Sequence, residues 1–198
     1  LPELSCDYVV TDNIAGAATM VNHLVKLGHQ RICYLSPSER RTSLVDRMSG
    51  FIRGMVEAGL PIDSHSVMRL RNVDVSESHA ELAQCVDQLL ALPDRPTAIF
   101  ASHDILAIQI QALLRERGVR VPEEMTLVGY DGIEAGEFCN PALTTIKQDF
   151  ALTAQTAARI LLERFGGRSN GLLYRSLIEP ELIVRQSSAV VAQRATAV

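Results

Sequence analysis

The chain of 198 residues is 47% hydrophobic and 21% charged, with a formal net charge of −4, which is typical of a folded globular protein and excludes a disordered one. The acidic balance argues against direct binding of the DNA phosphate backbone. No apolar run approaches the roughly 18 residues that a membrane span needs, so we expect no membrane partner. The beginning lacks a signal sequence and a starting Met, which predicts a cytoplasmic protein and suggests a fragment of a longer chain.

The first half of the chain alternates short apolar runs with amphipathic segments. The runs predict strands, and apolar residues that recur on one face predict helices. Gly28 stands where a left-handed cap ends a helix, and Gly59 and Pro61 stop a second one. The elements predicted in this half are strand 7–11, helix 14–25, strand 31–35, helix 44–55 and strand 67–70.

The second half continues this alternation as far as Gly129 and then changes. A loop with two glycines and a proline covers 130–141, and a β-branched strand and an Ala/Leu-rich helix follow it. Strands that alternate with helices predict an α/β fold with a mostly parallel, doubly wound sheet. The elements predicted in this half are helix 76–90, strand 97–101, helix 104–118, strand 125–129, strand 144–146, helix 154–165 and two short extended pieces around Pro180.

The stretch PALTTIKQDF at 141–150 ends a strand in polar residues, without the Gly or Pro of an ordinary turn. We interpret it as a crossing between two lobes near Ile146, where the strand does not turn back. Gln148 then faces the cleft between the lobes, and Asp149 is free to cap the next helix.

Polar side chains follow several strands at the edge where ligands of open α/β sheets bind. They are Asp131, Gln148, the adjacent pair His103 and Asp104, and Arg47 early in the second helix. Each also has an ordinary structural interpretation. Asp104 is a typical helix N-cap and Asp131 a typical turn former. Gln148 and Arg47 have the interpretation of solvated surface residues. Their convergence on one edge favours a binding site.

Several chemical motifs are absent from the sequence. The strand-to-helix junctions contain no glycine-rich phosphate loop, and there is no G-x-S-x-G or H-E-x-x-H motif. The five histidines have no metal-ligand spacing, and the four cysteines lie far apart without a C-x-x-C pair, which indicates reduced thiols. We therefore expect no enzyme activity, no cofactor and no metal.

Five segments resemble the lactose-repressor (LacI/GalR) family of bacterial transcription regulators in content, order and spacing. They are HLVKLGHQRICYL, RMSGF, PTAIFASHDILA, GVRVPEEMTLVGYDGIEAGEF and NPALTTIKQDF. The resemblance covers about residues 7 to 187, and VPEEMTLVGYDG together with PALTTIKQD is its most specific part. It implies a periplasmic-binding-protein-like effector domain with two lobes, doubly wound parallel sheets and three crossover strands.

The same resemblance implies that the second lobe is nearly complete and that the first lobe is partial. Residues 1–10 would end the first lobe, 11–146 would form the second lobe, 147–175 would return to the first lobe, and 176–198 would hold the last crossover and the C-terminal tail. In this family a helix-turn-helix headpiece precedes the effector domain. This chain does not contain one, so we expect it to reach operator DNA only through that absent headpiece.

The family's effector contacts carry over onto residues of this chain. Arg47 of DRMSGF matches the effector-contacting arginine, and Asp131 of GYDG matches the effector-contacting aspartate. Gln148 and Phe150 match the hinge pair beside the ligand. His103 stands where many members have Asn, which leaves the ligand class open.

Arg41 and Ser43 fall where purine-binding relatives have polar effector contacts. A carboxylate on paired hydroxyls, with an arginine opposite, suits a sugar or a nucleoside. The leading interpretation is the effector-binding domain of a DNA-binding transcription regulator, in which a small polar metabolite closes the lobes and controls operator binding. The resemblance also implies a homodimer, or a tetramer, formed partly through the second lobe. Phe138 is a candidate contact.

Two other functions stay open. One is a periplasmic sugar-binding protein of a transport system, against which stand the lack of a signal peptide, the four unpaired cysteines and the repressor-like VPEEMTLVGYDG segment. The other is an enzyme of flavodoxin-like architecture, against which stands the lack of a nucleophile paired with a base.

Overall fold

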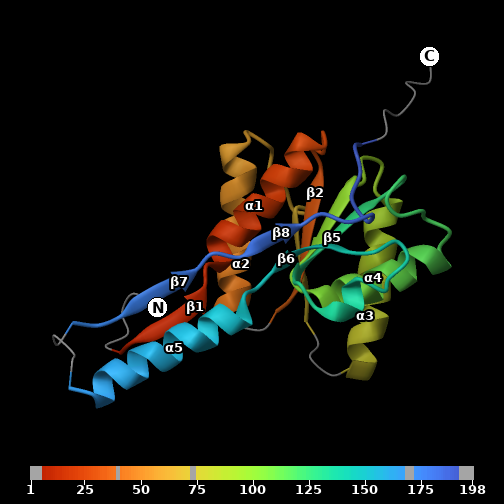
Figure 1. Cartoon of the computed structure of the whole chain (residues 1–198). Coiled ribbons are helices and arrows are strands. Elements are labelled where there is room, and N and C mark those ends of the chain that lie inside the picture. The colour runs from red at the N-terminus through yellow and green to blue at the C-terminus, as the bar shows by residue number, and fades with distance from the viewer. Residues whose placement is uncertain (1–5, 39–40, 72–74, 168–171, 192–198) are drawn as a thin grey trace.

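The computed structural model describes residues 6–38, 41–71, 75–167 and 172–191, with the side chains of 75–78 excepted. Over these residues, the body of the molecule is a six-stranded sheet in the order β3-β2-β4-β5-β6-β8 (Figure 1). Neighbouring strands run parallel except for β8, which is antiparallel to β6. The strands are β2 (Ile32–Pro37), β3 (Val67–Leu70), β4 (Ala98–Ala101), β5 (Thr126–Asp131), β6 (Thr144–Lys147) and β8 (Glu181–Ile183). The predicted α/β fold with a mostly parallel sheet is confirmed.

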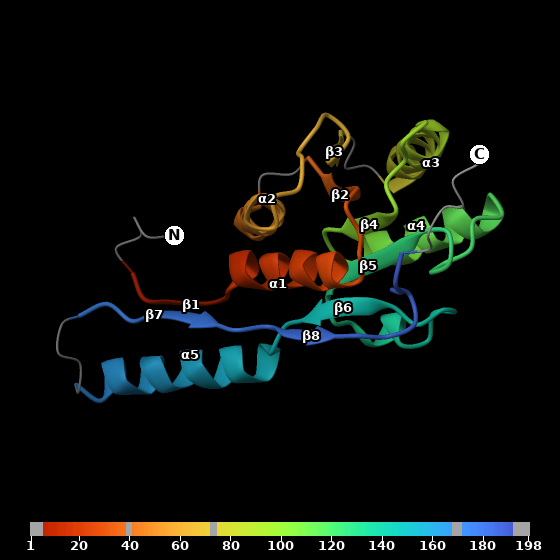
Figure 2. The same ribbon diagram turned by 90° about the horizontal axis from the view of Figure 1, so that it is seen from above.

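Helices cover both faces of this sheet (Figure 2). α1 (Asn13–Lys26) and α2 (Thr42–Glu57) pack on one face, and α3 (Val75–Ala91) and α4 (Asp104–Glu116) pack on the other. Successive side chains of a strand point to opposite faces, so a strand that is covered on both sides must be apolar throughout. The apolar runs of β2 and β4 have this pattern, and both strands are buried.

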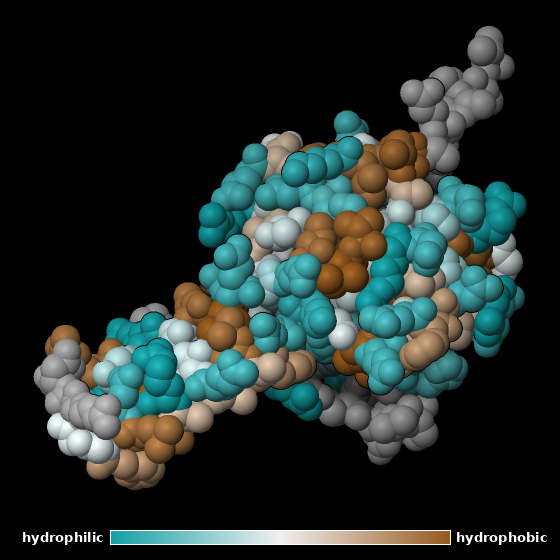
Figure 3. Space-filling model, viewed as in Figure 1, coloured by the Kyte–Doolittle hydropathy of each residue, from teal (hydrophilic) through white to brown (hydrophobic). Residues whose placement is uncertain are grey.

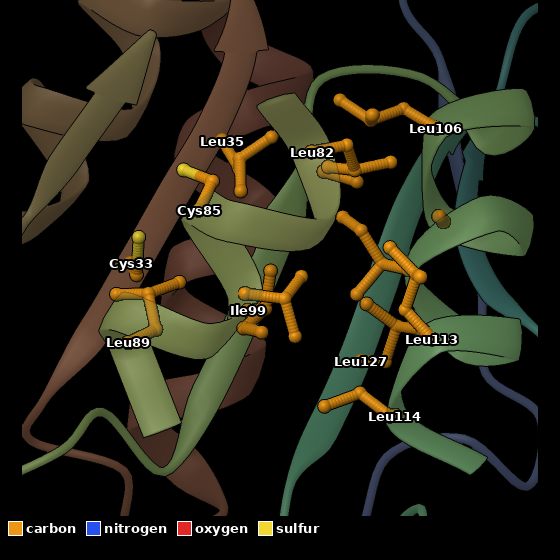
Figure 4. Packing of buried hydrophobic residues seen from close by; sticks show 14 of the residues in the cluster. Cys33, Leu35, Leu82, Cys85, Leu89, Ile99, Leu106, Leu113, Leu114 and Leu127 are labelled. Carbon is orange, nitrogen blue, oxygen red and sulfur yellow. The ribbon is translucent and has the colours of Figure 1, made fainter. Parts of the chain in front are cut away.

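The core is divided by the sheet into two hydrophobic clusters. On the α3 and α4 side, Cys33 and Leu35 of β2 pack with leucines of both helices, as Figure 4 shows. On the α1 and α2 side, Tyr34 contacts Phe51 and Phe100, with ring centroids 5.3 Å away in each case. All four cysteines are free, and burial raises the pKa of the Cys33 thiol above its ordinary value. This agrees with the expectation of reduced thiols.

A second, smaller sheet extends from the body as an arm (Figure 1). It consists of β1 (Tyr8–Thr11) and β7 (Arg175–Ile178), which are parallel, and α5 (Phe150–Phe165) lies alongside it. An ion pair joins helix and sheet, because Arg164 of α5 donates to Asp7 just before β1 over 2.6 and 2.7 Å. The same contact holds the pKa of Asp7 at about 2.

The ends of the helices follow the predicted signals closely. Asp12 and Asp149 cap α1 and α5, accepting from the backbone amides of Ala15 and Leu152 at 2.9 and 2.7 Å. Gly28 follows α1 with a φ of 87°, the left-handed conformation expected of it. The N-cap interpretation of Asp104 is wrong: the cap residue of α4 is His103, and Asp104 is the first helical residue.

Element boundaries differ from the prediction mainly at the edge that carries the polar residues. β5 continues two residues beyond Gly129, through Asp131, and a 3-10 turn (Glu134–Gly136) follows inside the predicted loop. α5 begins at Phe150, directly after its cap, and so starts earlier than its Ala/Leu pattern indicates. Among the helices that the structure describes, none combines the length and apolar character required to cross a membrane.

Candidate functional site

The carboxyl ends of β2, β4 and β5 meet at one edge of the large sheet, where a cavity of about 270 Å³ opens. The residues that follow these strands therefore come together, although they are far apart in the sequence. Five of the predicted site residues line this cavity. Among the residues that the structure describes, the lining consists of Pro37, Arg41, Ser43, Leu44, Arg47, His103 and Asp131.

Arg47 is held from several sides. Its guanidinium donates from Nε to Asn13 Oδ1 at 2.9 Å and from one terminal nitrogen to the carbonyl oxygen of Ser102 at 2.6 Å. It also lies over the ring of Tyr130, 3.9 Å from the centroid. The side chain is only 6% exposed, so a charge that is normally solvated is buried here. Such a charge needs a partner, and Asp131 supplies it.

Asp131 is the acidic residue among the described residues that line the cavity, and it pairs with Arg47. Its Oδ1 accepts from Arg47 at 2.8 Å and from Nε2 of Gln148 at 2.8 Å. Neither bond uses Oδ2, and the side chain is 25% exposed, so part of the carboxylate faces the cavity. The backbone of Asp131 has a φ of 120°, which side-chain-bearing residues rarely adopt. Such strain is concentrated at binding and active sites, where the surroundings hold it in place.

Gln148 connects Asp131 to the arm. Its Oε1 accepts from the hydroxyl of Thr11 at the end of β1, over 2.7 Å. The side-chain amide of Asn13 also contacts this strand, because it donates to the carbonyl oxygen of Thr11 at 3.1 Å. With Arg47 bonded to both Asn13 and Asp131, the five residues form a closed hydrogen-bonded ring. The ring includes two of the chain segments that join the arm to the body.

The remaining predicted residues have different positions. His103 lines the cavity, and its Nδ1 forms a 3.0 Å hydrogen bond with the hydroxyl of Ser102. Arg41 and Ser43 line it from the start of α2. Phe150 is not among the lining residues. It is 62% exposed at the first position of α5, on the arm side of Gln148.

Sequence reasoning missed four residues that hold the site together: Thr11, Asn13, Ser102 and Tyr130. The junction Thr11-Asp12-Asn13 contains no phosphate-loop motif, but it also follows a strand at the same edge. The place of Thr11 and Asn13 directly after a strand is the sequence signal that points to them. Ser102 contributes a backbone carbonyl, which has no signature in a sequence.

Another cavity of similar volume, about 250 Å³, lies at the opposite edge of the sheet. It is lined by residues just before β2 and β4, such as Arg31 and Pro96, and therefore lies at the amino ends of these strands. Open α/β sheets bind ligands at the carboxyl ends. Among the residues that the structure describes, no group of three or more His, Cys, Asp or Glu side chains is arranged to hold a metal ion.

Comparison with known proteins agrees with this geometry. The model of the family described as periplasmic binding protein-like domain matches residues 21–188. The chain belongs to this family. Among solved structures, the domain is similar to a LacI-family transcriptional regulator from Enterococcus faecium with bound ribose, at 28% identity and a TM-score of 0.79 over 94% of this chain and 66% of the other. It is also similar to the complex of the transcriptional regulator CelR with cellobiose, at 29% identity and a TM-score of 0.82 over 94% and 55%.

Curated relatives of the domain are transcriptional repressors. The HTH-type transcriptional repressor PurR of Mannheimia succiniciproducens is 34% identical over 188 residues, which is 94% of this chain and 54% of the relative. The HTH-type transcriptional repressor CytR of Escherichia coli is 32% identical over 187 residues, 94% and 53% of the two chains. The chain thus spans about half the length of the curated relatives it matches. These similarities place the domain with the LacI-family regulators, as the sequence motifs predict.

Proposed function

We propose that this domain binds a small polar metabolite, a sugar or a nucleoside-like compound, and is the effector-binding part of a DNA-binding transcriptional repressor. The observation that carries the proposal is the ion pair of Arg47 and Asp131 beside the cavity. A carboxylate that is partly exposed, with a buried arginine behind it, presents an acceptor that vicinal hydroxyls can bind. The E. faecium and CelR structures contain ribose and cellobiose, which supports the carbohydrate class.

Each lining residue has a role in this proposal. Asp131 accepts from ligand hydroxyls with the oxygen that its internal bonds leave unused. Arg41, Ser43 and His103 offer hydrogen bonds from the other wall of the cavity. Gln148 reaches the ligand from the junction of β6 and α5, and Phe150 packs against an apolar face of the ligand when the arm side closes.

The arm supports a two-lobed arrangement. We assign residues 1–10 and 147–175 to a first lobe, 11–146 to the second lobe, and 176–198 to the last crossover and the tail. α5 carries exposed apolar side chains, which Figure 3 shows as brown areas on the arm. They include Leu161, Leu162 and Phe165, the last of which is 84% exposed. A helix with such a surface normally packs against further protein.

Ligand-driven closure of the two lobes would change the presentation of a DNA-binding headpiece outside these 198 residues. The proposed functional unit is a homodimer, with a tetramer as the larger alternative, and its operator contacts belong to that headpiece. The acidic net charge of the domain supports the assignment of the operator contacts to the headpiece, because the DNA backbone is itself negatively charged.

A thermal-shift screen tests the proposal. The panel contains D-ribose and other pentoses, hexoses, cellobiose and the common nucleosides, because a compound that binds only the folded state raises the unfolding midpoint. We expect one class of compound to raise it in the native protein and not in Asp131→Asn. The matched control is Asp87→Asn, which removes the carboxylate charge of another Asp–Arg pair, with Arg117, away from the cavity. A compound that stabilises all three proteins equally would contradict this site.

A further inference from the structure

Asp104 is a fully buried carboxylate that is not in the proposed binding site. It lies at the start of α4, yet its hydrogen bonds leave the helix. Oδ2 accepts from the backbone amide of Ile133 at 2.9 Å, and Oδ1 accepts from the hydroxyl of Thr145 on β6 at 2.6 Å. That hydroxyl also accepts from the amide of Gly132 at 3.3 Å. The two residues that follow Asp131 are therefore both tied to Asp104, one directly and one through Thr145.

The glycines on either side of Tyr130 and Asp131 fit this arrangement. A side chain at Gly129 would overlap the Oδ1 atom of Asp104, so glycine is what leaves room for the carboxylate. Gly132 has a φ of 73°, and a Cβ atom there would lie 2.7 Å from the Cα of Lys147. The motif GYDG thus describes a turn that closes over a buried carboxylate and packs directly against β6.

Asp131 needs such support because of its own backbone. Its φ of 120° is a sparsely populated conformation for a residue with a side chain, and it persists only where neighbouring contacts determine it. The contacts next to it in the chain are those of Gly132 and Ile133, which lead to Asp104. The side-chain bonds to Arg47 and Gln148 hold the carboxylate but do not fix the turn.

We propose that Asp104 is a positioning residue for the binding site: it holds the turn 131–133 so that the Asp131 carboxylate faces Arg47, Gln148 and the cavity. The importance of Asp104 for ligand binding rests on the proposed function of the cavity. A carboxylate is suited to this task because it accepts two hydrogen bonds at separate oxygens and donates none. The first turn of α4 also favours a negative charge.

Two substitutions test the proposal without a ligand. Asp104→Ala removes both acceptors, whereas Thr145→Val removes the hydroxyl and retains the shape of the side chain. Leu89→Ala serves as the control, because Leu89 is fully buried on α3 and its loss lowers stability without touching the turn. Asp104→Asn is a milder version that keeps a single acceptor, in case the alanine variant does not fold.

The readouts are amide hydrogen exchange at Gly132 and Ile133 and the NMR signals of the Arg47 guanidinium protons. We expect exchange at these two amides to rise at least tenfold over that of β2 amides in Asp104→Ala, and the Arg47 signals to broaden. Asp131→Ala, which removes the ion-pair partner of Arg47, should broaden the same signals. Leu89→Ala should raise exchange everywhere alike and leave the Arg47 signals sharp. If Asp104→Ala or Asp104→Asn behaves like Leu89→Ala in both readouts, Asp104 is only a stability residue and the inference is overturned.

These outcomes are separate from those of the proposed function. If no compound in the screen binds, the proposed function fails while the exchange data still decide the role of Asp104. If a compound binds through Asp131 but Asp104→Ala leaves both ligand-free readouts at control values, the proposed function stands and the positioning role fails.

Discussion

The contact between α1 and α2 supports a specific prediction about Gly50. A Cβ atom at this buried position would lie 2.9 Å from the Cβ of Ala17 and would collide with the backbone carbonyl of Ile14. Ordinary contacts begin at 3.4 Å. Because the obstructing atoms belong to backbone and to a short side chain, they cannot rotate away. Gly50→Ala must therefore push the two helices apart by roughly half an ångström or more.

The magnitude follows from two opposing effects. Alanine favours the helix over glycine by about 1 kcal/mol, while overpacking costs about 1–3 kcal/mol. With backbone as the obstacle we take the upper part of that range, and expect the free energy of unfolding to fall by about 1–2 kcal/mol, or the midpoint by roughly 2–8 °C. The displacement would also draw Arg47, one turn earlier on α2, away from Asn13 at the start of α1.

Urea denaturation, followed by circular dichroism, measures this change, and an unchanged m value shows that the comparison is valid. The control is Ser49→Ala, the preceding residue on the exposed side of α2, where the same helix preference acts without a clash. It should be neutral or slightly stabilising. If Gly50→Ala is as stable as the native protein or more stable, the close approach of α1 and α2 is not a constraint and the reasoning is refuted.

Two further predictions concern assembly and pH. Phe138 is 79% exposed beside a groove of about 280 Å³ on α4, which suits a self-complementary contact, so Phe138→Asp should halve the mass measured by light scattering; an unchanged mass would exclude this surface. Burial raises the pKa of Asp104 to about 6, against about 3.9 in an unfolded chain, so the folded state keeps this proton longer. The stability that this group contributes is complete below about pH 4 and is lost as the pH rises to about 6. Between about pH 4 and 6 the free energy of unfolding should therefore fall more, or rise less, in the native protein than in Asp104→Asn. If the free energy of unfolding depends on pH in the same way in both proteins, the pKa of Asp104 is not raised.

Much of the candidate site could be predicted because parallel strands bring their carboxyl ends together. Arg47, His103 and Asp131 each follow or flank such an end, and the structure places all three around one cavity. The prediction required only the strand pattern and the rule for open α/β sheets. Capping signals are equally local, and Asp149, predicted as a cap, accepts from the amide of Leu152.

What could not be predicted depends on contacts between distant segments. Asp104 has the sequence context of a helix cap, and nothing local distinguishes that role from a bond to Ile133, 29 residues later. The ring through Thr11 and Gln148 spans 137 residues, and the stacking of Arg47 on Tyr130 depends on the spacing of a helix and a strand. The contribution of Phe150 stays a prediction, because its ring is 62% exposed and is not among the described residues that line the cavity.

The central claim is that the cavity beside the Arg47–Asp131 pair binds the effector. A hydrogen bond to a charged group contributes about 1.5–3 kcal/mol, which is roughly ten- to hundredfold in affinity. Titration calorimetry with the strongest binder of the screen should therefore show an affinity for Asp131→Asn that is about tenfold or more below that of the native protein. The affinity for Asp87→Asn should equal the native one, because its ion pair joins α3 to Arg117, directly after α4 and away from the cavity. Equal affinity of the native protein and both variants would contradict the account.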